Sequence, residues 1–230
     1  MAYTNLQTKG EMRVRKLSPC LLLAFIGFIG FGITFVYFAS SIGNQSITRF
    51  DTSIIGVVQG WEKPWLTTVL KGFTWVGSGF GVTPISMIGF IVLYYVIRRR
   101  QQAFFLIITV AGSIILNFVL KHYFIRERPE IHRIMDAKGY SFPSGHAMMA
   151  MALYAIIVFF FWHHVKTTGN RIILVLFAAF MIIIIGMSRI YLGVHYPSDI
   201  IGGYAASGLW VMIMIMVYTY FRKPERPAHE

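Results

Sequence analysis

The sequence predicts an all-α membrane protein with six transmembrane helices. The 230 residues are 56% hydrophobic and only 13% charged. Several apolar runs approach or exceed the roughly 20 residues that cross the hydrocarbon core of a bilayer. Most Lys and Arg residues, which give a net charge of +12, lie beside the ends of these runs, as is typical of cytoplasmic loops in membrane proteins. This placement argues against nucleic acid as a partner.

The chain is interpreted as one integral membrane domain over residues 1–230. The expected spans are residues 17–39, 82–97, 103–120, 144–162, 172–187 and 200–221. The first span is longer than the apolar part of a signal peptide, so we expect it to be retained. It contains Cys20, the single cysteine, which we interpret as a small packing residue; no disulfide can form within the chain.

Residues 42–80 are interpreted as interfacial helices on the extracytoplasmic side. Trp61, Trp65 and Trp75 lie in this segment, and tryptophan is enriched where a membrane meets water. Apolar residues recur there with helical spacing, which is typical of helices that lie on a membrane surface. A further transmembrane span hidden in this segment is the alternative.

The orientation follows from the positive-inside rule. Basic residues gather at one face: Arg13, Arg15, Lys16, Arg98, Arg99, Arg100, Lys166, Arg171, Arg222, Lys223 and Arg226. That face is expected to be cytoplasmic, with the N-terminal segment 1–16 and the tail 222–230. The segments 42–80, 121–143 and 188–199 then lie on the extracytoplasmic face.

The stretch 188–199, Ser-Arg-Ile-Tyr-Leu-Gly-Val-His-Tyr-Pro-Ser-Asp, joins the last two spans. Pro197 is suited to the first turn of a helix, so we expect Asp199 in that turn, close enough to reach His195. A carboxylate bound to one ring nitrogen sets the histidine tautomer and leaves the other nitrogen free to attack. This arrangement indicates a nucleophile, although a structural hydrogen bond is the alternative.

Two further clusters lie on the same face. Lys121 ends a span and Arg128 follows seven residues later, before Pro129; alone, such residues often contact lipid headgroups. The sequence Pro143-Ser144-Gly145-His146 opens a span and would expose unpaired N–H groups to an anion, or be only an N-cap. Together with Arg189, His195 and Asp199, these clusters provide the cations and proton-transfer groups that a phosphate ester requires.

These residues resemble the signature of the type 2 phosphatidic acid phosphatases. That signature has three parts: Lys and Arg-Pro separated by six residues, Pro-Ser-Gly-His, and Ser-Arg followed after five residues by His and after three more by Asp. Every position is filled here with the same spacing, from Lys121 to Asp199. Size and layout are similar to those of bacterial members of the family, which favours a bacterial origin.

The resemblance implies a metal-independent lipid phosphatase without a cofactor. Its substrates would be phosphomonoesters or diphosphates of lipids, with phosphatidylglycerophosphate and undecaprenyl diphosphate as the leading candidates. His195 would form a phosphohistidine, oriented by Asp199, and His146 would protonate the leaving oxygen and then activate water. The transferred phosphate would be held by Lys121, Arg128, Ser144, Gly145 and Arg189.

Two alternatives stay open. The first is a transporter or binding protein that recognises phosphorylated lipids without hydrolysis; transporters usually place ionisable residues within their spans, and here the charges lie at the ends. The second is a zinc site of His122, His132, His146 and His195, which no tight ligand spacing supports. His163 and His164 lie on the opposite face. No obligate protein partner is indicated.

Overall fold

The computed structural model describes residues 19–43, 46–130 and 132–221, and these residues form helices and loops without any strand. The elements are α1 (Pro19–Gly43), α2 (Thr48–Gln59), α3 (Pro64–Val76), α4 (Gly79–Ile91), the π-helical turn η1 (Val92–Val96), α5 (Arg100–Phe124), α6 (Gly145–Phe161), α7 (Thr168–Tyr191) and α8 (Pro197–Phe221). The predicted all-α class is therefore confirmed.

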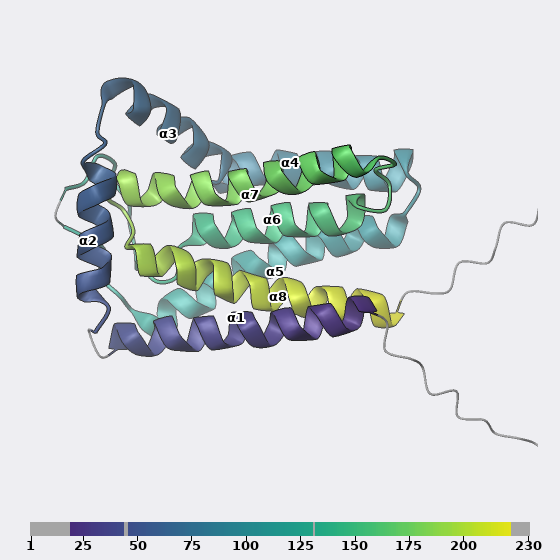
Figure 1. Ribbon diagram of the computed structural model, residues 1–230, viewed down its shortest axis with the longest axis horizontal. Helices are drawn as coiled ribbons and strands as arrows, with labels where there is room; N and C mark the ends of the chain where they lie inside the picture. The colour runs from purple at the N-terminus through teal and green to yellow at the C-terminus, as the bar shows by residue number, and fades with distance from the viewer. Residues whose placement is uncertain (1–18, 44–45, 131, 222–230) are drawn as a thin grey trace, which may run out of the picture.

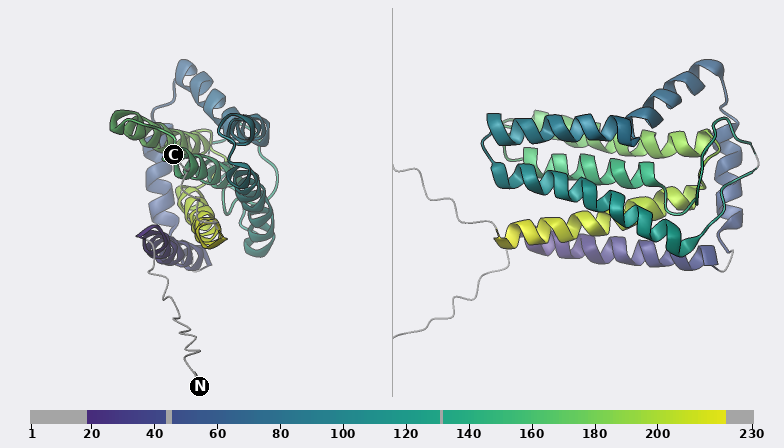
Figure 2. Two further views of the ribbon diagram at one scale, coloured as in Figure 1. Left: turned by 90° about the vertical axis from the view of Figure 1, so that its right-hand side faces the viewer. Right: turned by 180° about the vertical axis from the view of Figure 1, so that it is seen from behind.

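The long helices run along one another in a bundle with α6 at its centre (Figures 1 and 2). α6 contacts α4, α5, α7 and α8, whereas α1 packs mainly along α8. Small residues of α6, including Ala147, Ala150 and Ala152, are fully buried. They let the neighbouring backbones approach closely, as is usual where helices pack within a membrane.

Five helical segments are long and apolar enough to cross a bilayer. They are Pro19–Gly43, Gly79–Val96, Arg100–Phe124, Thr168–Tyr191 and Pro197–Phe221. α6 is apolar but has only 17 residues, so the count of six spans remains a prediction. The helix expected over residues 172–187 is longer at both ends, and Ser188–Tyr191 forms the last turn of α7 rather than a loop.

The segment 42–80 contains no further span among the residues described. α2 and α3 have 12 and 13 residues, each too short to cross a bilayer. α2 lies across one end of the bundle, and α3 slants from this end toward α4 (Figure 1). Both helices thus cover the end of the bundle where α5 finishes and α8 begins.

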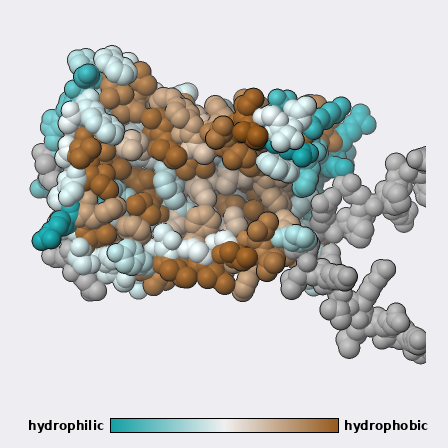
Figure 3. Space-filling model, viewed as in Figure 1, coloured by the Kyte–Doolittle hydropathy of each residue, from teal (hydrophilic) through white to brown (hydrophobic). Residues whose placement is uncertain are grey.

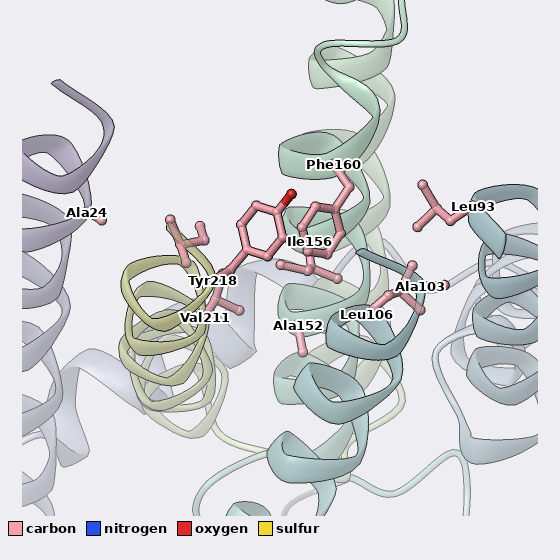
Figure 4. Packing of buried hydrophobic residues seen from close by; sticks show 10 residues of the cluster. Ala24, Leu93, Ala103, Leu106, Ala152, Ile156, Phe160, Val211 and Tyr218 are labelled. Carbon is pink, nitrogen blue, oxygen red and sulfur yellow. The ribbon is translucent and has the colours of Figure 1, made fainter. Parts of the chain in front are cut away.

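The other half of the bundle contains a hydrophobic core. Leu93, Leu106, Ile156, Phe160 and Val211 from four neighbouring elements pack there and are essentially inaccessible (Figure 4). On the face shown in Figure 3, hydrophobic side chains cover the middle of the surface and hydrophilic residues lie toward its two ends. The polar residues of the three sequence motifs lie instead toward the end of the bundle covered by α2 and α3.

Candidate active site

A cavity of about 570 Å³ opens at the end of the bundle covered by α2 and α3. It lies where the ends of α5 and α7, the start of α6 and the loop 125–144 meet α3. The lining residues used below are Lys71, Thr74, Trp75, Phe80, Lys121, Arg128, Asp136, Lys138, Gly145, His146, Arg189 and His195. Six of the eight predicted site residues thus face one cavity.

His195 lies in the short connection between α7 and α8 and is held by Asp199. Its Nδ1 is 3.2 Å from Asp199 Oδ2, as the spacing predicts. Asp199 is the third residue of α8, and its Oδ2 also accepts the backbone N–H of Tyr196 at 2.9 Å. This is the contact that an acidic residue makes at this position of a capping box. The helix start therefore fixes the carboxylate, and the carboxylate fixes the imidazole.

The tautomer of His195 follows from its second neighbour, Arg128. Arg128 Nη1 is 3.1 Å from His195 Nε2, and a guanidinium can only donate hydrogen bonds. Nε2 must therefore be the unprotonated nitrogen, while Nδ1–H donates to Asp199. The lone pair is thus on Nε2, the nitrogen that faces Arg128. Both His195 and Arg128 line the cavity.

Burial lowers the pKa of His195 below its ordinary value, although the adjacent Asp199 acts in the opposite sense. Arg189 and Arg128 lower the pKa further by repulsion. His195 is only 2% exposed, so a charged imidazole would lose most of its hydration. The ring is consequently neutral at physiological pH, which is the state a nucleophile requires.

Arg128 is fixed by three backbone carbonyls. It donates to Gly139, Val194 and Lys138 at 2.8, 2.7 and 3.1 Å. Burial lowers the pKa of Arg128, but a guanidinium stays charged in proteins. A cation is therefore held beside His195 Nε2 before any substrate arrives.

Two more cations face the cavity from helix ends. Arg189 in the last turn of α7 donates to Thr74 Oγ1 at 2.7 Å. Its buried Nε has no hydrogen-bond partner, and among the residues described it is the only buried side-chain nitrogen or oxygen without one. Lys121 in the last turn of α5 donates to the carbonyl of Tyr140. A buried donor without a partner is costly, so Arg189 is suited to an anion.

The start of α6 contributes Gly145 and His146 to the cavity, and Ser144 directly precedes them. Ser144 is fully buried and does not line the cavity. Its Oγ accepts the backbone N–H of Ala147 at 3.5 Å, because Ser144 is the N-cap of α6. Ser144 therefore caps α6, and its predicted contact with phosphate stays a prediction.

Three residues behind His195 were missed from the sequence. Ser141 donates to Asp199 Oδ2, and Arg126 Nη1 donates to Asp199 Oδ1 at 2.6 Å. Arg126 also pairs with Asp51 of α2 at 2.8 Å and covers the ring of Tyr196 at 4.1 Å. Ser141 lies beside the Pro-Ser-Gly-His motif and Arg126 between Lys121 and Arg128, which is the only sequence signal for either residue.

Asp51 also binds the start of α8. Its two carboxylate oxygens accept the backbone N–H and the hydroxyl of Ser198 at 2.9 and 2.6 Å. A carboxylate at a helix N-terminus is stabilised by the helix dipole. α2 is thereby attached to the helix that positions Asp199.

The remaining histidines do not join the cavity. His132 pairs with Glu62 at 2.8 Å, and His122 contacts the carbonyl of Phe118 at 2.8 Å. Within the described part of the chain, no three His, Cys, Asp or Glu side chains are grouped so that they could hold a metal ion. The zinc ligand set considered above is therefore not assembled.

This fold and site define a class of protein: an apolar helical bundle whose cationic cavity contains a buried neutral histidine paired with a carboxylate. Residues 102–223, more than half of the chain, match the model of the PAP2 superfamily. The chain belongs to this superfamily, and it is a membrane protein and a phosphatase.

Individual relatives agree with this assignment. Phosphatidylglycerophosphatase B of Bacillus subtilis (strain 168) is 28% identical over 194 residues, which are 84% of this chain and 93% of the relative. The crystal structure of the transmembrane PAP2 type phosphatidylglycerolphosphate phosphatase from Bacillus subtilis has a TM-score of 0.80 at 24% identity, covering 86% of this chain and 98% of that one. Aquifex aeolicus LpxE has a TM-score of 0.56 at 23% identity, covering 75% and 96%.

Proposed function

We propose that the chain hydrolyses the terminal phosphomonoester of phosphatidylglycerophosphate, giving phosphatidylglycerol and inorganic phosphate. The observation that supports this most directly is the geometry of His195, whose Nε2 lone pair lies beside Arg128 while Asp199 holds Nδ1. The choice of lipid is supported by the name of the Bacillus subtilis relative. Undecaprenyl diphosphate is the competing substrate.

The reaction has two steps. His195 Nε2 attacks phosphorus, the bond from phosphorus to the lipid oxygen breaks, and His146 donates a proton to that oxygen. Water then attacks the phosphohistidine, His146 accepts a proton from it, and phosphate leaves with the N–P bond broken. Lys121, Arg128 and Arg189 neutralise the phosphoryl oxygens in both transition states, and the Gly145 N–H at the start of α6 adds a donor.

The assay is phosphate release from the purified protein in detergent. We expect His195→Ala to abolish release, while His132→Ala, a histidine at the same end of the bundle outside the cavity, keeps wild-type activity. Brief reaction with lipid radiolabelled in its terminal phosphate should yield a phosphoprotein that is labile to acid and stable to base. A base-labile phosphoester, or full activity in His195→Ala, would refute the proposed nucleophile.

The same preparation separates hydrolysis from binding alone. A transporter or lipid-binding protein would retain the radiolabelled lipid without releasing phosphate. An enzyme should release many equivalents of phosphate per protein molecule. Binding without release in the wild-type protein would favour the non-catalytic alternative.

We further propose a bacterial protein of the cell membrane that crosses the bilayer six times, with its active site on the extracytoplasmic face. The cavity and the basic residues 98–100 lie at opposite ends of the bundle, in agreement with the positive-inside rule. In a Cys20→Ser background, a cysteine at Glu130 should react with an impermeant thiol reagent added to intact cells, and one at Lys166 should not. The reverse pattern would place the active site inside.

A further inference from the structure

The cavity extends beyond the groups that the reaction uses. Its inner part is formed by buried or half-buried residues such as Arg189, His195 and Gly145, whereas Lys71 and Lys138 lie at its mouth and are exposed. These two lysines have no part in the signature from Lys121 to Asp199. From these positions we propose that Lys71 and Lys138 form a second anion subsite, which binds a second phosphate of the lipid substrate.

Lys71 is placed by the spacing of α3. Lys71, Thr74 and Trp75 all line the cavity, and positions i, i+3 and i+4 share one face of a helix. Thr74 accepts the hydrogen bond from Arg189 at 2.7 Å, so this face is fixed against one of the inner cations. Lys71 lies three residues earlier, about 4.5 Å along the helix axis.

The position of Lys138 is fixed by hydrogen bonds from Arg128 to the backbone. Its carbonyl accepts from Arg128 Nη2 at 3.1 Å, and the carbonyl of the next residue, Gly139, accepts from Arg128 Nε at 2.8 Å. The backbone that carries Lys138 is therefore attached to Arg128. Each outer lysine thus belongs to a segment that is hydrogen-bonded to a different inner cation: Lys71 to the helix that binds Arg189, and Lys138 to the loop that binds Arg128.

The mouth is also where a lipid must pass. Trp75 and Phe80 line the cavity and are 59% and 82% exposed, and tryptophan is enriched at the headgroup level of a membrane. When the phosphate to be cleaved reaches His195, the part of the headgroup nearest the acyl chains lies at this level. In phosphatidylglycerophosphate that part is a phosphodiester, and in a lipid diphosphate it is the phosphate attached to the chain.

Asp136 completes the mouth with an exposed carboxylate. Two lysines and one aspartate leave a net charge of +1, which still favours an anion. A carboxylate can in addition accept a hydrogen bond from a hydroxyl group. The glycerol between the two phosphates of phosphatidylglycerophosphate has such a hydroxyl, whereas phosphatidate has neither this hydroxyl nor a second phosphate.

The inference rests on the proposed function and makes the lysines a determinant of substrate choice. We therefore test Lys71→Gln, Lys138→Gln and the double variant on phosphatidylglycerophosphate, undecaprenyl diphosphate and phosphatidate in one detergent. Partly exposed charge contacts are weak, so kcat/KM on phosphatidylglycerophosphate should fall about threefold for each lysine and about tenfold for both. On phosphatidate it should change less than twofold.

Lys63→Gln is the matched control, since Lys63 is exposed at the start of the same helix but does not line the cavity. It should leave all three rates unchanged, which separates binding at the mouth from general attraction to anionic micelles. A loss on undecaprenyl diphosphate as well would mean that any second phosphate is recognised. A loss confined to phosphatidylglycerophosphate would mean that its phosphodiester is recognised.

Equal losses on phosphatidate and on the lipids with two phosphates would overturn the inference, as would unchanged rates in the double variant. Neither result would affect the proposed hydrolysis, because the wild-type protein would still release phosphate. Conversely, a wild-type protein that releases phosphate from none of the lipids would refute the proposed function itself.

Discussion

Arg126 joins two buried carboxylates, and its replacement should weaken both the fold and the catalytic step. Asp51 and Asp199 are 1% and 0% exposed, and Arg126 pairs with them at 2.8 and 2.6 Å. We consider Arg126→Leu, which keeps apolar bulk beside the ring of Tyr196 but removes the charge. Asp51 and Asp199 would then remain close together without the cation between them.

The expected loss of stability is large. Removing one partner of a buried ion pair costs about 3–5 kcal/mol, because the other charge stays buried. For a chain of this size that corresponds to a fall in Tm of about 6–20 °C. The double variant Asp51→Asn/Arg126→Leu should recover part of the loss, since one of the unpaired carboxylates is then neutral.

The catalytic effect should appear in kcat. Arg126 does not line the cavity, so substrate binding and KM should change little. Asp199 would lose a charged hydrogen bond that orients it toward His195, a contact that contributes about 1.5–3 kcal/mol. The corresponding fall in kcat is about ten- to hundredfold.

The assays are thermal unfolding in detergent and steady-state phosphate release. Arg49→Gln, an exposed arginine of α2 at the same end of the bundle, is the control and should match the wild-type protein in both. A Tm within about 2 °C of wild type would refute the reasoning on the buried charges. A rise in KM at constant kcat would instead show that Arg126 contacts substrate.

Three further predictions concern packing, pH and metal ions. In Gly202→Ala the new Cβ would lie 2.3 Å from the buried ring of Phe142, costing about 1–3 kcal/mol in unfolding free energy; Gly30→Ala, with nothing within 4 Å, should leave Tm unchanged. Burial lowers the pKa of His195 in the folded protein. As the pH falls below about 6.5, His195 therefore binds a proton only in the unfolded state, so the stability of the folded protein should decrease below this pH. His195→Gln should show a smaller decrease of Tm between pH 7 and pH 5. A metal chelator should leave phosphate release unchanged, and a loss restored by zinc would revive metal-assisted chemistry.

Much of the site could be predicted because its residues are close in the sequence to helix ends. The proline at position 197 begins α8, and this puts Asp199 one turn from His195. Apolar runs show where helices lie within a membrane, so the motifs could be assigned to their ends. The predicted helix boundaries were less exact. The span expected to end at residue 187 continues as α7 to Tyr191, because polar residues do not by themselves end a helix.

For Ser144 the sequence allowed two roles, and the structure shows one of them. A serine before a helix can bind an anion or cap the first turn, and sequence alone leaves both open. In the structure Ser144 is buried beneath the start of α6 and its hydroxyl caps that helix. The burial of Ser144 depends on the packing of other helices, which the sequence does not show, and its contact with phosphate stays a prediction.

The sequence by itself determined the class of the protein: long apolar runs, three motifs at one face, and the local pairing of His195 with Asp199. Only the tertiary structure showed that Asp51 binds Ser198 across 147 residues of sequence and that Thr74 holds Arg189 across 115. Pairing within one helical turn follows from local backbone geometry, which a sequence pattern reveals. Contacts between distant segments depend on how whole helices pack. The residues that make such contacts have no characteristic separation in the sequence, so a sequence pattern does not reveal them.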